Sequence, residues 1–204
     1  MLEKLKAARA GVIFVSLTGA KLFGQGLLVL DQGNGSIGEP ITQATALPDN
    51  QIAQSFTPFL SAVGFVQLQT ITFQDNNGAG VVFALNLREG AYNGPILSST
   101  TPVVMIRGPI QTGPFYFPDN IPVTPGQLYF FEPVLQSSGQ VDIATKFPSS
   151  YLGGDLWSNG GKDSTVDLWF REGIVVPEPR TVWLLLFGSC VFIWRSRGGR
   201  NSRL

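Results

Sequence analysis

The 204-residue chain contains no histidine, and this absence narrows the chemistry that it can perform. Histidine is the side chain that most often acts as a general base, activates nucleophiles and binds transition metals. The single cysteine, Cys190, lies in an apolar segment near the C-terminus and has no second cysteine for an internal disulfide. The hydrophobic core must therefore stabilise the fold, and the composition argues against catalysis.

Charged residues are also scarce, at 14% of the chain, and 14 basic residues balance 14 acidic ones. The basic residues gather at the two ends. Residues 43–176 contain ten acids against five bases, a net charge of −5. Nucleic-acid binding requires a basic surface that contacts phosphates. We therefore do not expect a nucleic-acid partner.

The N-terminal residues 1–26 have the three-part layout of a secretory signal peptide. Lys4, Lys6 and Arg9 precede an apolar run over residues 10–20, and small residues follow it. This run is too short to span a bilayer, which requires about 20 residues. We predict an N-terminal signal helix; the alternative is an amphipathic helix of a cytosolic protein.

Near the C-terminus, residues 181–194 contain no charged side chain and are followed by scattered arginines. As a helix, this segment would rise about 21 Å, against about 30 Å for a hydrocarbon core. Flanking arginines that snorkel or a locally thinner bilayer would supply the difference. We predict a short transmembrane helix with its arginines on the cytoplasmic side. The alternative is a buried β-strand.

Pro177, Glu178 and Pro179 stand shortly before the apolar segment, and the arginines follow it. This order of features resembles the PEP-CTERM sorting signal. Pro177, Glu178 and Pro179 match its motif, although Arg180 and Thr181 stand where a serine or alanine commonly follows. The retention tail would comprise Arg195, Arg197, Arg200 and Arg203. The resemblance implies recognition and cleavage by an exosortase-type membrane protease. It also implies transient anchoring in the inner membrane of a Gram-negative bacterium that makes exopolysaccharide, then delivery to the cell surface or extracellular matrix.

Between the two ends, residues 43–172 consist of short runs rich in β-branched and aromatic residues, separated by glycine-rich and asparagine-rich turns. Several runs alternate in polarity, so that Val166, Leu168 and Phe170 are expected to face one side of a strand. This pattern predicts an antiparallel β-sandwich with a jelly-roll-like arrangement. We expect linkers over residues 27–42 and 173–180.

The body also resembles a family of secreted β-sandwich modules found in proteins anchored in this way. The resemblance rests on "AQSFTP", "TPGQLYFF", "YLGG" and "DLWFR" in chain order. These are mainly folding signals, so they imply an architecture more than an activity.

A glycine-rich loop between the last two predicted strands carries candidate ligands for a glycan. Aromatic rings stack on sugar CH groups, while carboxylates and amides hydrogen-bond hydroxyl groups. The candidates are Tyr151, Asp155, Trp157 and Asn159, with Trp169 and Tyr92 as additions. The alternative is that Tyr151 and Trp157 form a hydrophobic lid over the open end of the sandwich.

No other group of residues in the sequence predicts metal binding or catalysis. Asp155, Asp163 and Asp167 lie close in sequence, but their spacing matches no EF-hand, and no pair of acids is singled out for glycoside hydrolysis. We therefore expect no catalytic residue, metal or cofactor. The sequence predicts an exported, non-enzymatic structural or binding protein. The alternative is a carbohydrate-binding module that attaches to exopolysaccharide.

Overall fold

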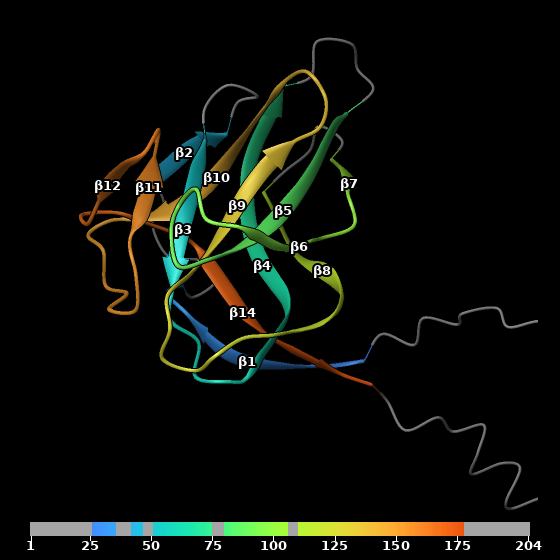
Figure 1. Ribbon diagram of the computed structural model, residues 1–204. Coiled ribbons are helices and arrows are strands. Elements are labelled where there is room, and N and C mark those ends of the chain that lie inside the picture. Colours follow the sequence, from blue (N-terminus) through green and yellow to red (C-terminus); the bar gives the residue numbers. More distant parts are fainter. Residues whose placement is uncertain (1–25, 36–41, 47–50, 75–79, 106–109, 178–204) are drawn as a thin grey trace, which may run out of the picture.

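The computed structural model describes residues 26–35, 42–46, 51–74, 80–105 and 110–177, which form two antiparallel β-sheets packed face to face (Figure 1). The first sheet contains β1 (Leu27–Gly33), β2 (Thr42–Ala46), β4 (Ala62–Gln74), β8 (Gln111–Pro122), β10 (Gln140–Lys146), β13 (Asp167–Leu168) and β14 (Phe170–Val176). The second contains β3 (Ile52–Phe56), β5 (Val81–Glu89), β6 (Ile96–Ser99), β7 (Val103–Met105), β9 (Tyr129–Leu135), β11 (Leu156–Ser158) and β12 (Gly161–Asp163). The predicted all-β antiparallel sandwich is confirmed.

The chain crosses repeatedly between the two sheets. The first sheet has the order β1-β14-β4-β10-β13, with β2 also paired to β10 and β8 to β4. The second has the order β12-β11-β3-β9-β5-β6, with β7 also paired to β5. Successive strands from β3 to β5, and again from β8 to β11, belong to alternate sheets. Most of the core contacts therefore join residues that are distant in sequence.

Alternation of polarity along the strands determines which side chains enter the core. Leu168 and Phe170 are fully buried in the core, and Val166 packs against it, as predicted. The inner faces of the two sheets meet through aromatic rings. Phe131 of β9 lies 5.0 Å from Phe170 of β14, between ring centroids. Burying a side chain of this size contributes about 2 to 3 kcal/mol, so such pairs hold the sheets together.

The domain boundaries predicted at residues 43 and 172 are wrong at both ends. Residues 27–33, which we expected to be a linker, form β1, and β14 continues to Val176. The two strands pair along their length, from Leu27 opposite Val176 to Gly33 opposite Arg171. Gly173 permits this close approach, because a Cβ there would collide with the Val29 carbonyl oxygen. The sequence does not reveal β1 because this edge strand is only partly buried and its partner lies at the other end of the chain.

Residues 1–25 and 178–204 lie outside the residues that the structure describes. They carry nearly all of the predicted signal peptide, most of the sorting motif, the apolar segment and the arginine tail, which stay predictions. Pro177 is the last described residue, and it is exposed and outside any strand. No helix capable of crossing a membrane occurs in the described part of the chain.

Candidate functional site

The four predicted glycan-binding residues do not form one surface. Leu156 of β11 points into the core, so Trp157, the next residue along the strand, points to the outer face of the second sheet. Tyr151 instead packs against the core. The set therefore divides between the inside of the sandwich and its outer surface.

Tyr151 closes one end of the sandwich. Its ring meets Phe170 edge-on at a centroid distance of 5.1 Å and an interplanar angle of 90°. Its hydroxyl donates a hydrogen bond of 2.6 Å to Gln32 Oε1 and accepts one of 3.4 Å from the Thr57 backbone N–H. Burial raises the pKa of the Tyr151 phenol well above its ordinary value. This placement corresponds to the lid interpretation for Tyr151.

Trp157 lies on the outer face and stacks on Tyr92, which comes from the loop after β5. The two ring centroids are 5.9 Å apart and the rings are inclined by 18°. The indole also meets Phe130 of β9 edge-on at 5.8 Å. Phe130 is 1% exposed although it is not part of the core cluster between the sheets, and the Trp157 ring packs against it. Both Trp157 and Tyr92 remain half-buried, and together they form an aromatic surface on the second sheet.

Asp155 and Asn159 flank this surface on the β11–β12 hairpin. The Asp155 carboxylate forms an ion pair of 2.7 Å with Lys162. Asn159 has a φ of 49°, followed by Gly160 at 79°, which is the conformation of a two-residue hairpin turn. Its backbone N–H donates a 2.9 Å hydrogen bond to the Gln51 carbonyl oxygen. Asn159 therefore shapes the turn and presents an exposed amide beside Trp157.

A buried charged network supports the aromatic surface, and sequence reasoning missed it. Glu132 of β9 is 3% exposed and accepts hydrogen bonds from Arg88 Nε (2.8 Å), Asn86 Nδ2 (3.0 Å) and Gln51 Nε2 (3.0 Å). The Tyr92 hydroxyl donates to Gln51 Oε1 at 2.9 Å, which joins the surface to the network. The only local signal was alternation, which places Asn86 and Arg88 on the polar face of β5.

The remaining acids of the predicted loop do not converge. Asp167 is buried and accepts hydrogen bonds from Gln54 Nε2 and Ser149 Oγ. Asp163 is exposed, and hydrogen bonds from Thr165 lower its pKa. With Asp155 paired to Lys162, the three aspartates serve separate local roles.

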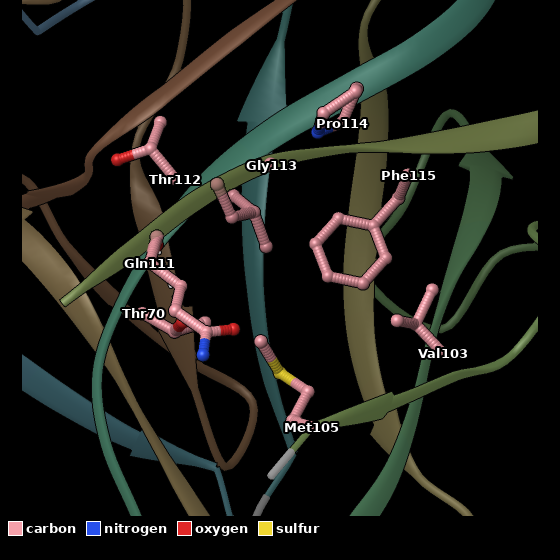
Figure 2. Close-up of a pocket in the computed structure, with 9 residues that line it drawn as sticks. Thr70, Val103, Met105, Gln111, Thr112, Gly113, Pro114 and Phe115 are labelled. Carbon is pink, nitrogen blue, oxygen red and sulfur yellow. Dashed lines mark hydrogen bonds between the residues drawn. The ribbon is translucent and has the colours of Figure 1, made fainter. Parts of the chain in front are cut away.

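A cavity of about 140 Å³ opens beside β7 and β8 (Figure 2). Figure 2 shows it surrounded by side chains from both strands and by Thr70 of β4. The lining combines apolar side chains (Leu68, Val103, Met105, Phe115) with polar ones (Thr70, Gln111, Thr112). None of the lining residues is acidic, basic or a cysteine, so the cavity offers a shape for a small apolar group without acid–base chemistry.

Comparison with known proteins does not assign the chain to a family. No protein-family model matches the chain, and no curated protein matches it.

Proposed function

We propose that this chain is an exported, non-enzymatic β-sandwich protein that a C-terminal PEP-CTERM signal sorts to the cell surface or extracellular matrix. An exosortase-type membrane protease would recognise Pro177, Glu178 and Pro179 while residues 181–194 hold the precursor in the inner membrane. The alternation of successive strands between the sheets supports a jelly-roll-like arrangement of the body. Such a sandwich would act after release as a structural or binding component.

The pairing of the first and last described strands carries this proposal. Leu27 lies directly opposite Val176, so the chain enters and leaves the sandwich at the same place (Figure 1). The predicted signal peptide precedes this point and the predicted sorting motif follows it. Cleavage on either side would therefore leave every strand of the described sandwich intact. This arrangement supports a precursor that is processed at both ends.

The intact mass of the protein recovered from the surface of an exosortase-containing host tests the proposal. We expect a product that lacks the N-terminal signal and residues 181–204. Replacement of Pro177, Glu178 and Pro179 by alanine should leave the protein in the membrane fraction with its C-terminal segment. Asp163→Ala, an exposed change on β12, is the control and should not alter the mass. Recovery of surface protein that retains residues 181–204 would overturn the sorting proposal.

The aromatic surface formed by Tyr92 and Trp157 favours a second candidate, a module that binds exopolysaccharide. The stacked rings lie beside the exposed side chains of Gln51 and Asn159, and the Ser99 hydroxyl lies across the same sheet, bonded to Asn86. Aromatic faces flanked by amides and hydroxyl groups suit a neutral or weakly charged glycan.

Affinity electrophoresis of the full-length protein in detergent, run in gels that contain the host polysaccharide, tests this second candidate. The wild-type protein should be retarded, and Trp157→Ala should migrate as it does in a gel without polysaccharide. Tyr151→Phe removes a hydroxyl on the inner side of the fold and should remain retarded. If the wild-type protein shows no retardation on any polysaccharide, the glycan-binding candidate fails, whereas the sorting proposal is unaffected.

A further inference from the structure

Glu172 is the most unusual charged residue among those that the structure describes. It lies on β14, on the same face as Phe170, and its side chain is fully buried. Neither of its carboxylate oxygens has a hydrogen-bond partner within the described residues. Buried polar atoms are nearly always paired, so two unpaired oxygens on one carboxylate require an explanation.

Asp31 brings a second carboxylate to the same point. Glu172 pairs with Gln32 across the β1–β14 ladder, and the register shifts between Leu30 and Gln32, so Asp31 is the irregular residue. Asp31 Oδ2 accepts hydrogen bonds from the backbone N–H groups of Phe59 (2.8 Å) and Leu60 (2.9 Å). Its carboxyl group lies within hydrogen-bonding reach of Glu172. Two ionised carboxylates this close repel each other because both are negatively charged, and neither can donate a hydrogen bond to the other.

Among the described residues, no positively charged side chain compensates Glu172. Burial, reinforced by Asp31 and only partly offset by the Gln32 side chain, raises the pKa of Glu172 to about 8, and no lysine or arginine contributes to this shift. Arg171, the neighbouring base, points to the other face of β14, where its guanidinium lies over the Trp169 ring. The described surroundings of Glu172 thus supply oxygen atoms without a counter-charge.

We propose that Asp31 and Glu172 bind a divalent cation of the calcium type. Calcium prefers oxygen ligands and neutralises neighbouring carboxylates. The Gln32 side chain and the Tyr151 hydroxyl, which are hydrogen-bonded to each other at 2.6 Å, lie beside the pair. Within the described ranges, no group of three or more acidic, histidine or cysteine side chains could hold a metal. Backbone oxygens and water would therefore complete the coordination.

The cation would fasten the edge of the first sheet. β1 pairs with β14 and with no other strand of the described sheet, so its attachment depends on this single ladder. A cation shared by Asp31 and Glu172 would add a second link between the two strands. It would hold together the place at which the chain enters and leaves the sandwich. This inference does not depend on the sorting proposal.

Thermal unfolding of the full-length protein in detergent, first in EDTA and then with added calcium, tests the site. We expect saturating calcium to raise the midpoint of the wild-type protein by about 5 °C, since a ligand that binds the folded state alone stabilises it. Glu172→Gln keeps the size of the side chain but removes the charge, and it should abolish the rise. Glu89→Gln makes the same change at an exposed position and should retain it.

Terbium luminescence gives a second readout that does not depend on stability. Terbium replaces calcium at oxygen sites, and Tyr151 is close enough to sensitise its emission. We expect a signal that calcium displaces and that Glu172→Gln removes. If Glu172→Gln does not fold, Asp31→Asn takes its place, because its amide oxygen can still accept the two backbone N–H groups. A wild-type protein with neither a calcium-dependent midpoint nor a terbium signal would overturn the proposal and indicate that the two carboxyl groups share a proton.

Discussion

Two buried glutamates, one on each sheet, differ in whether their carboxylate oxygens have hydrogen-bond partners. Glu132 of the second sheet is 3% exposed, and its two oxygens accept hydrogen bonds from Arg88, Asn86 and Gln51. Glu172 of the first sheet is fully buried, and neither oxygen has a partner within the described residues. Removing a carboxylate from water costs several kcal/mol unless its charge is neutralised and its lone pairs are bonded.

The difference shows that the described residues supply hydrogen-bond partners for both oxygens of Glu132 but for neither oxygen of Glu172. The partners of Glu132 come from two segments, β5 and the residue before β3, and one of them, Gln51, also binds the loop that carries Tyr92. Glu172 instead faces another acid, Asp31, and the neutral side chain of Gln32. The hydrogen-bonded network around Glu132 stabilises the aromatic surface, whereas the unpaired carboxylate of Glu172 is the basis of the proposed cation site.

Substitution by glutamine at Glu132 and at Glu172 should produce the largest difference in the free energy of unfolding. Glu132→Gln leaves Arg88 half-buried without a counter-charge, and we expect it to lower the free energy of unfolding by about 3 kcal/mol. Glu172→Gln in calcium-free buffer at neutral pH removes the cost of protonating a buried carboxyl group on folding, so the change should stay within about 1 kcal/mol or favour folding. Urea denaturation of both variants measures the contrast. Equal losses would mean that Glu172 is as well compensated as Glu132.

The second largest effect is expected in the pH dependence of stability, which should distinguish Glu172 from Glu132. In EDTA, folding raises the pKa of Glu172 from about 4.5 to about 8, so between these values the folded state holds a proton that the unfolded state has released. Stability must then fall as the pH rises through this window, by up to about 1.4 kcal/mol per pH unit. Unfolding measured from pH 5 to pH 8 should show this slope in the wild-type protein and lose it in Glu172→Gln. The slope should persist in Glu132→Gln, because Glu172 is unchanged there.

Sequence reasoning predicted the fold class well because alternation is a local signal. Val166, Leu168 and Phe170 were assigned to one face from their spacing, and the structure buries Leu168 and Phe170 in the core with Val166 packed against it. The edge strand β1 was missed because its partner in β14 is more than a hundred residues away and its burial is weak. Pairing between the two ends of a domain has no signature within either segment.

Candidate site residues could be predicted from the sequence only where they lie in one continuous segment. The β11–β12 hairpin was visible as an aromatic residue beside a turn, so Trp157 and Asn159 could be singled out. The sequence left lid and platform open, because the face on which Trp157 lies depends on the register of β11. Tyr151 is placed by contacts with Gln32 and Phe170, which belong to other strands. The network around Glu132 and the pair formed by Asp31 and Glu172 assemble from distant strands, and nothing in their local sequence distinguishes them from ordinary surface residues.

Removal of the Trp157 ring from the aromatic surface should have a smaller effect on stability. Trp157→Ala removes the stacking partner of Tyr92 and exposes the edge of Phe130, and we expect a loss of about 1 to 2 kcal/mol in the free energy of unfolding. Phe59→Ala is the control, because Phe59 is 75% exposed and its loss should change stability by less than about 0.5 kcal/mol. If the two variants lose equal stability, the indole does not support the second sheet.

The smallest effect is expected where the Glu132 network reaches the surface. Tyr92→Phe removes the hydroxyl that donates to Gln51 Oε1 and should cost about 0.5 to 1 kcal/mol. Because Gln51 also donates to Glu132, the cost should shrink in a Glu132→Gln background, and a double-mutant cycle measures this coupling. Tyr151→Phe removes a hydroxyl on the Glu172 side of the molecule, so its cost should add to that of Glu132→Gln without coupling. Equal coupling for both tyrosines would mean that the two buried glutamates belong to one network that spans the sheets.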